Sequence, residues 1–182
     1  IAVERPERGA GAGEPAAMAW LDPPPGAALA AANAKLQALG ALDGELRITP
    51  HGRAMAALPM APEPAHMLLY AAQHGAEQSA AKLALLLQER GLGGRGDDLA
   101  QRLERWDGDR SGRAEAARKL ASRWAKLVGK GPGQAQPPPL AILLAEAFPE
   151  RVAKARGPSG EFQLANGRGV FLEATDALAR SK

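Results

Sequence analysis

Apolar residues recur at helical spacing over much of the chain, which predicts a mainly α-helical protein. We expect helices over residues 64–74 and 78–90, and two further helices before residue 129. Gly75 and Gly91 follow the first two as stop signals, because glycine readily adopts the left-handed conformation that ends a helix. Residues 61–128 are therefore predicted to form a helical bundle.

The last two helices of this bundle carry the clearest apolar spacing. Leu99, Leu103 and Trp106 lie at i, i+4 and i+7, and Leu120, Trp124 and Leu127 repeat that spacing. We expect both sets to face the core. A stripe of bases lies one position away from the second set, at Lys119, Arg123 and Lys126. The last helix of the bundle should therefore bury one face and expose an adjoining cationic face.

Before the bundle, residues 14–60 are predicted to form a small winged-helix unit. A short helix over residues 14–20 and a longer one ending at Leu39 precede the dipeptide Asp43-Gly44, which favours a type I′ hairpin. Thr49 then has a side chain suited to capping a helix, and Pro50 suits the first helical position. We expect that helix over residues 51–58.

After the bundle, residues 129–139 are rich in glycine and proline and predict a linker. A helix kinked at Pro149 is expected over residues 140–156, followed by a hairpin over residues 161–172 that turns at Asn166-Gly167. Such a hairpin is not stable alone, so it must pack on the bundle or pair with strands absent from this chain. At the other end, we expect residues 1–13 to be disordered.

Composition narrows the class of protein. Of the 182 residues, 46% are hydrophobic but only 4% are aromatic, which favours close-packed helices over a sheet protein. The chain contains no cysteine, which removes disulfides and thiolate metal sites. No apolar run is long enough to cross a bilayer and no signal peptide is evident, so we expect no membrane partner and a cytoplasmic location.

Motifs for catalysis are weak. Residues 91–96 satisfy G-x-G-x-x-G but follow a predicted helix instead of a strand, which favours an interhelical loop over a dinucleotide site. Gly129-Lys130-Gly131 lacks the rest of a phosphate-binding loop, and the three histidines lack zinc-ligand spacing. Asp98 and Asp109 lie at predicted helix ends, where acids stabilise the first turn. We expect no catalytic residue and no metal site in this chain.

Basic charge is unevenly distributed, although the net charge is only +3. Residues 110–130 contain seven bases against the single acid Glu115, and a second basic cluster includes Arg156 and Arg168. Repeated bases attract the repeated phosphates of nucleic acid without reading its sequence. The alternative is an ordinary solvated helix face.

Seven segments resemble the region that follows the motor domains of DEAH-type helicases. Those shared with the winged helix and the following ratchet bundle are WLDPPP (20–25), LGALD (39–43), ITPHGRAMAAL (48–58), AHMLL (65–69) and LALLLQER (83–90). Two more, RVAKARG (151–157) and LANGRG (164–169), are similar to the bacterial HrpB subgroup. The resemblance implies that residues 140–182 begin an OB-like region and that the chain is a fragment.

The resemblance also implies a function for the parent protein. Its motor domains, which precede this region, would bind ATP and magnesium, and no cofactor is expected in this chain. The ratchet and OB-like parts would line the path of a single strand of RNA or DNA. We therefore expect a non-catalytic accessory region that couples single-stranded nucleic acid to the helicase motor domains. Its expected contacts are Lys119, Arg123, Lys126, Arg156 and Arg168. The alternative is a purely structural protein-docking module without nucleic-acid binding.

Overall fold

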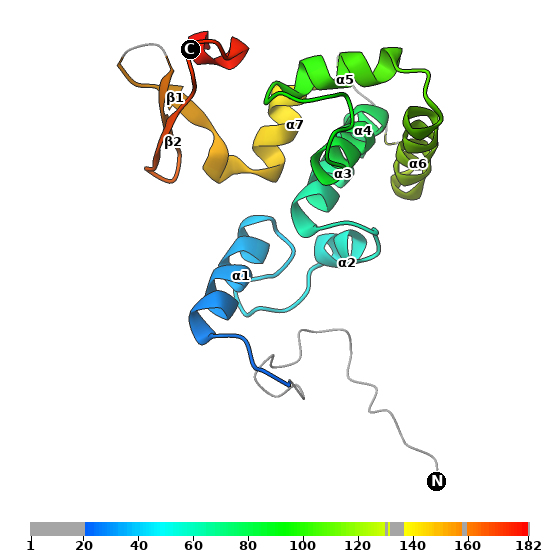
Figure 1. The fold of residues 1–182 in the computed structure, drawn as a ribbon. Helices are drawn as coiled ribbons and strands as arrows, with labels where there is room; N and C mark the ends of the chain where they lie inside the picture. Colours follow the sequence, from blue (N-terminus) through cyan, green and yellow to red (C-terminus); the bar gives the residue numbers. More distant parts are fainter. Residues whose placement is uncertain (1–20, 130, 132–136, 158–159, 182) are drawn as a thin grey trace. The chain divides into compact units, whose positions relative to one another are not determined.

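The computed structural model describes residues 21–129, 131, 137–157 and 160–181 (Figure 1). Seven α-helices and a three-stranded sheet lie within these residues, so the prediction of a mainly helical protein with a short C-terminal β-structure is confirmed. The predicted disorder of residues 1–13 and helix of residues 14–20 fall outside the described part. The chain divides into two compact units, residues 1–62 and 63–182, each described below by itself.

In the described part of the first unit, residues 21–62, the helices α1 (Gly26–Ala38) and α2 (Pro50–Ala56) are joined by a loop. Thr49 caps α2 as predicted: its hydroxyl oxygen accepts a hydrogen bond of 2.9 Å from the amide of Gly52, and it donates one of 2.6 Å to the carbonyl of Gly40. Gly52 lies against the backbone between the helices, because a β-carbon there would be 2.1 Å from the oxygen of Ala41. The cap and this close approach hold α2 on the segment that follows α1.

The predicted type I′ hairpin at Asp43-Gly44 is wrong in its turn geometry. A single antiparallel bridge joins Leu42 to Ile48, and the left-handed residue of the loop is Leu46, with φ of 60°. The carboxylate of Asp43 accepts hydrogen bonds of 2.9 Å from the amides of Glu45 and Arg47. These bonds organise a longer, side-chain-supported loop, because an aspartate can satisfy nearby amides more locally than a strand ladder can.

The second unit is organised around α4 (Glu77–Gln88), which packs against α5 (Leu99–Gly108), α6 (Gly112–Val128) and α7 (Leu140–Ala147). The side chains of Leu83 and Leu86 on α4 are fully buried. The helix that precedes α4 is α3 (Pro62–Gln73). Gly75 follows α3 with φ of 71°, which confirms the stop signal predicted there. Gly91 also has a positive φ, of 80°, but α4 already ends at Gln88 with an extended cap residue at Glu89, so Gly91 belongs to the following loop and does not end the helix.

Aspartate and serine side chains begin the next two helices. The carboxylate of Asp98 accepts hydrogen bonds from the amides of Ala100 and Gln101 at the start of α5. Ser111 caps α6 by accepting a hydrogen bond of 3.2 Å from the amide of Ala114. The acid at position 98 therefore has the structural role expected for it.

The buried face of α6 differs from the predicted one. Trp124 is buried, but the side chains predicted to join it, Leu120 and Leu127, are 37% and 59% exposed. The core positions are instead the small residues Ala114, Ala121 and Ala125, on the helix that makes the most extensive contact with α4. Alanine lets two helix backbones approach closely, so the better-packed face of α6 excludes the larger leucines.

The C-terminal part also differs from the sequence expectation. The helix α7 ends at Ala147, a short 3-10 turn η2 (Pro149–Arg151) follows, and residues predicted to remain helical form a strand, β1 (Ala153–Ala155). Pro149 lacks the amide needed to continue the α-helical ladder. The predicted hairpin is confirmed as β2 (Glu161–Leu164) and β3 (Gly169–Phe171), with Gly167 in the turn at φ of 84°.

These strands form an antiparallel sheet in the order β1-β2-β3 (Figure 1). Lys154 pairs with Gln163, and Phe162 pairs with Val170. The hairpin therefore pairs with β1, a strand of this chain. From the sequence, we expected any partner strand to be absent from the chain. A 3-10 turn, η3 (Ala177–Arg180), follows, and the carbonyl of Ala179 accepts a hydrogen bond of 2.9 Å from the amide of Gly160.

Most of the predicted linker, at residue 130 and residues 132–136, lies outside the described residues. Gly131 donates a hydrogen bond of 3.0 Å to the carbonyl of Ala72, near the end of α3. A β-carbon at position 131 would be 2.4 Å from that oxygen, so this position requires glycine. In the described part of the chain, no helix is long and apolar enough to span a membrane.

Candidate nucleic-acid interface

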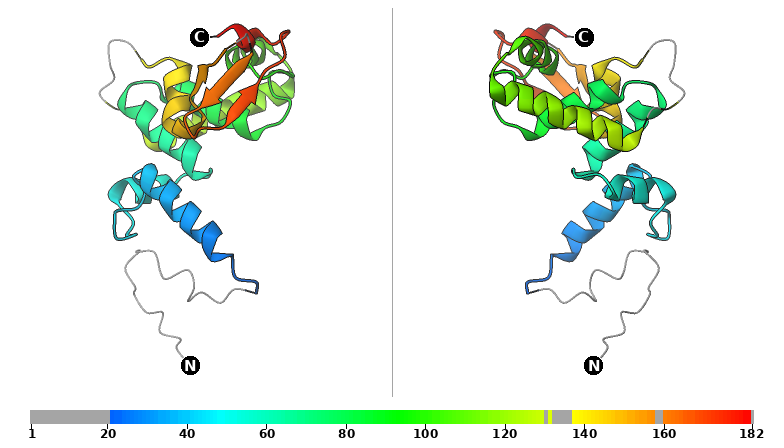
Figure 2. Two further views of the ribbon diagram at one scale, coloured as in Figure 1. Left: turned by 90° about the vertical axis from the view of Figure 1, so that its left-hand side faces the viewer. Right: turned by 90° about the vertical axis from the view of Figure 1, so that its right-hand side faces the viewer.

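Three bases line the exposed side of α6 at intervals of about one helical turn. We call Lys119, Arg123 and Lys126 the cationic stripe, and all three side chains are exposed. In the right-hand view of Figure 2, α6 is the yellow-green helix that runs along the near surface of its unit. The stripe lines a shallow surface hollow together with Glu115, Arg118 and Ser122. The structure thus brings the three predicted primary contact residues together on one accessible surface.

One member of the stripe is partly neutralised. The ammonium of Lys119 lies 2.7 Å from a carboxylate oxygen of Glu115, one turn earlier on α6, and both side chains are mostly exposed. The hydrogen bond from Lys119 and then its charge lower the pKa of Glu115, with a smaller contribution from the charge of Arg118. Among the described residues, neither Arg123 nor Lys126 has an acidic partner within ion-pair distance. Their charges remain available to a ligand.

Two other bases of the same region have structural roles. A guanidinium nitrogen of Arg118 donates a hydrogen bond of 2.8 Å to the carbonyl of Trp106 on α5. Arg113 donates one of 3.0 Å to the carbonyl of Arg90, beyond the end of α4. Both arginines therefore tie α6 to neighbouring segments, a division of roles that the linear charge pattern does not reveal.

Arg156 and Arg168, the two secondary candidates, are exposed in the sheet region but do not form one cluster. The amide of Arg156 donates to the carbonyl of Glu161, at the start of β2. The carbonyl of Arg168 accepts from the amide of Leu164, at the end of β2. The two arginines thus lie on opposite sides of β2 and at opposite ends of it. Each arginine therefore offers a ligand one isolated positive charge, and the two do not act as a cluster.

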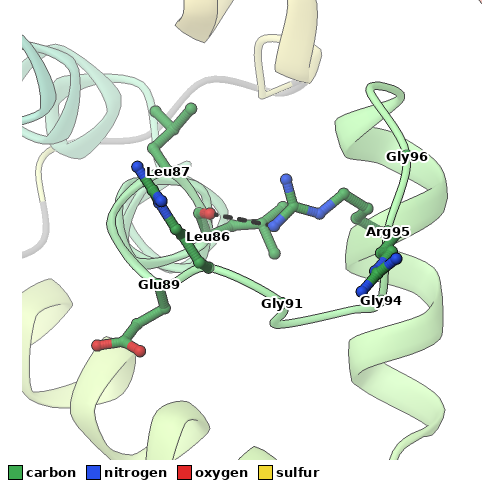
Figure 3. A pocket seen from close by; sticks show the side chains of 9 residues that line it. Leu86, Leu87, Glu89, Gly91, Gly94, Arg95 and Gly96 are labelled. Atoms are coloured by element: carbon green, nitrogen blue, oxygen red, sulfur yellow. Dashed lines mark hydrogen bonds between the residues drawn. The ribbon is translucent and has the colours of Figure 1, made fainter.

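The glycine-rich segment between α4 and α5 is an interhelical loop, as predicted (Figure 3). Its path is held by arginines of α5: Arg102 donates hydrogen bonds to the carbonyls of Leu86 and Leu92, and Arg105 donates one of 3.1 Å to the carbonyl of Arg95. A β-carbon at Gly93 would lie 2.1 Å from the oxygen of Arg102. Gly93 therefore permits close packing of the loop on α5, and the element directly before the loop is the helix α4 instead of the strand that a dinucleotide site requires.

The histidines of the second unit have local partners. His74 lies 2.8 Å from the carbonyl of Tyr70 through its Nδ1 atom, and the two rings are 4.2 Å apart. His66 lies 3.8 Å from a carboxylate oxygen of Glu146. Within the described residues, no group of three or more histidine, aspartate or glutamate side chains is arranged to hold a metal ion.

A feature that the sequence analysis missed is the exposed apolar pair Leu120 and Leu127, which borders the cationic stripe on α6. The helical spacing predicted these residues to be in the core. Their exposure could have been anticipated only from the competing run of alanines at positions 114, 121 and 125, which fits the same helical period.

Comparison with known proteins relates both units to helicases. Residues 36–60 match the family described as the winged-helix form of the helicase associated domain (HA2). The chain is 40% identical over 170 residues, 93% of its length, to a protein named ATP-dependent RNA helicase HrpB from Escherichia coli strain K12. The match covers 20% of that relative, so the chain spans about one fifth of its length.

Solved structures give the same relationship. The chain matches a crystal structure described as the E. coli DExH-box NTPase HrpB and another described as the Escherichia coli DEAH/RHA helicase HrpB. Each match has a TM-score of 0.74 at 39% identity, and covers 92% of this chain and 20% of the other. These values relate the fold and the sequence over nearly the full length of the chain.

Proposed function

We propose, from the premise that this chain belongs to the helicase-associated region of HrpB-type helicases, that it contacts single-stranded nucleic acid and couples it to motor domains elsewhere in the parent protein. The cationic stripe on α6 is the primary contact surface in this proposal, and Arg156 and Arg168 provide separate secondary contacts. RNA is the first ligand to test, because the E. coli relative is named an RNA helicase.

The observation that carries the proposal is the regular spacing of exposed, largely uncompensated charge. Three bases lie about one turn apart on one side of α6, and only Lys119 has an acidic partner among the described residues. Repeated phosphates bind such a surface by releasing counterions, and these contacts require no particular base sequence. The stripe extends along roughly 10 Å of helix, given the rise of 1.5 Å per residue.

Adenosine triphosphate and magnesium belong to the parent protein in this proposal. The described residues do not fit either group, because the glycine-rich loop is packed against α5 at Gly93 and no described carboxylate cluster suits a metal ion. The role of this chain is therefore to bind and position a strand. Hydrolysis is left to the motor domains.

A protein-docking module is the second candidate function, and an apolar hollow supports it. The hollow lies between α4 and α7 in the second unit, and its lining includes the exposed side chains of Leu87, Ile142 and Val152. The guanidinium of Arg151 lies 4.8 Å from the ring centre of Phe148 at the same place. Exposed apolar side chains gathered around one hollow are typical of protein interfaces.

The proposed function is tested by binding of a fluorescent single-stranded oligonucleotide to the full 182-residue chain, without ATP. Charge reversal of the stripe (Lys119→Glu, Arg123→Glu and Lys126→Glu together) should abolish most of the binding for any base sequence. Arg123→Glu alone should weaken binding more than Arg110→Glu, an equal charge change at an exposed position before α6. Unchanged affinity in the triple variant would refute the assignment, and no binding by the unaltered chain would favour the docking module.

A further inference from the structure

The cationic stripe has an apolar neighbour on the same helix. Leu120 and Leu127, which we call the leucine ridge, are 37% and 59% exposed. They lie seven residues apart, which is about two turns, so they project from the same side of α6. Single exposed leucines are common on protein surfaces, but these two lie about 10 Å apart along one side of the helix and so offer two apolar contacts in line, given the rise of 1.5 Å per residue.

The positions of the ridge and the stripe around the helix axis are fixed by the helical repeat. Each residue advances by about 100°, so Leu120 follows Lys119 and Leu127 follows Lys126 by that angle. Around the helix axis, Arg123 lies between the side that carries the two lysines and the side that carries the two leucines. Moving further around α6 leads to Trp124, which is buried. The ridge therefore borders the stripe along its length, between the exposed charges and the packed core.

We propose that the leucine ridge holds the exposed base faces of a single strand whose phosphates lie on the cationic stripe, so that α6 distinguishes an unpaired strand from a duplex. This inference rests on the proposed function and adds a second set of residues to it. The stripe attracts any polyphosphate, whereas the ridge can contribute only when base faces are accessible. The discrimination between an unpaired strand and a duplex therefore comes from the leucine ridge.

The chemical difference between a duplex and a single strand supports the single strand as the ligand of the leucine ridge. In a duplex, the faces of the bases are stacked inside the helix and the outer surface offers mainly phosphates and sugars. An unpaired strand offers both charged phosphates and flat apolar faces, as proteins that bind single strands exploit. Charge complementarity on the flank of the ridge therefore favours a nucleic acid over a neutral apolar partner.

The ridge is aliphatic, which sets the expected strength and specificity of the contact. The tryptophan of α6, Trp124, is buried and cannot stack on a base. Leucine offers apolar contact without the directional stacking of an aromatic ring. The contact should therefore be modest for each base and tolerant of base identity, which suits a surface along which a strand moves.

The experiment compares three ligands of equal length: a single-stranded RNA oligonucleotide, a strand of the same backbone with abasic sites at its centre, and a duplex. The ridge variant is Leu120→Gln with Leu127→Gln, and the stripe variant is the triple charge reversal described above. Leu46→Gln is the matched control, because Leu46 is a leucine of similar exposure, 39%, in the other compact unit of the chain. Circular dichroism and thermal melting verify that each variant is folded.

We expect the ridge variant to bind the ordinary single strand about 3- to 10-fold more weakly, since loss of apolar base contact costs less than loss of aromatic stacking. Its affinity for the abasic strand and the duplex should stay unchanged, and so should all affinities of the Leu46 control. The stripe variant should lose all three ligands.

Two results would overturn the inference while leaving the proposed function in place. The ridge variant could bind the ordinary strand as well as the unaltered chain does, or it could lose all three ligands equally. A ridge variant with unchanged strand affinity but altered self-association in sedimentation would assign the ridge to a second copy of the chain. Absence of binding by the unaltered chain would refute the proposed function itself, and this inference with it.

Discussion

The guanidinium of Arg118 donates a hydrogen bond of 2.8 Å to the main-chain oxygen of Trp106. In return, the indole nitrogen of Trp106 donates one of 3.1 Å to the main-chain oxygen of Ala114 on α6. This reciprocal arrangement fixes α6 against α5 near the start of the cationic stripe. It also separates two kinds of base on one helix: Arg118 stabilises the fold, whereas Lys119, Arg123 and Lys126 face solvent.

Replacement of Arg118 by alanine should lower the free energy of unfolding by about 1–2 kcal/mol, because the charge-assisted hydrogen bond to Trp106 is lost. Chemical denaturation monitored by tryptophan fluorescence measures this change. Arg123→Ala is the matched control and should leave stability nearly unchanged. The reverse pattern, with Arg123 needed for stability and Arg118 dispensable, would contradict the division of roles.

Substitution of Gly93 by alanine should destabilise the loop between α4 and α5. Its φ of 69° disfavours an L side chain, and the new β-carbon would lie 2.1 Å from the main-chain oxygen of Arg102. We expect a loss of about 1–3 kcal/mol in the free energy of unfolding. Gly91→Ala shares the positive φ but meets no atom within 4 Å, so it isolates the steric part of the effect. Equal stability of the two variants would show that the close contact is absent.

Removal of the Lys119 charge should raise the pKa of Glu115. In the unaltered chain, Lys119 lowers the pKa of this carboxyl below its ordinary value of 4.5. A lowered pKa means that the ion pair favours the folded state above pH 4.5, and that this contribution is lost as the pH falls through the pKa of the folded state. Both side chains are mostly exposed, so the contribution of the pair to stability should be small.

The pKa of Glu115 can be measured by carbon-detected NMR titration in the unaltered chain and in Lys119→Met. The variant should titrate closer to pH 4.5. Arg123→Met is the control, because Arg123 is not among the causes of the shift. An unchanged pKa in Lys119→Met would mean that the two side chains are not paired in solution.

Local signals predicted much of the fold because they act within a few residues. The cap at Thr49, the stop at Gly75 and the turn at Gly167 each depend on the side chain or backbone preference of nearby residues. The strand β1 was missed because its conformation depends on pairing with β2, and residues 153–155 alone carry too short a pattern to indicate it.

The basic residues of the candidate site could be predicted from the sequence, but the apolar residues that are exposed beside them could not. The spacing of Lys119, Arg123 and Lys126 placed them on one side of a helix without any tertiary information. Which apolar residues would be buried was not decided by spacing, because alanines and leucines of α6 follow the same period on adjoining sides. Close packing against α4 favoured the alanines, and so left the leucine ridge exposed beside the stripe.

The salt dependence of single-strand affinity tests the central claim most directly, because phosphate contacts release counterions and apolar contacts do not. The three phosphate contacts of the cationic stripe should contribute about −2 to the slope of log affinity against log salt concentration, given roughly −0.7 for each contact with a single strand. The triple charge reversal of the stripe should remove this part of the slope and leave only the part that comes from Arg156 and Arg168. An affinity insensitive to salt, or an equally steep slope in the triple variant, would contradict a role for the cationic stripe in binding the strand.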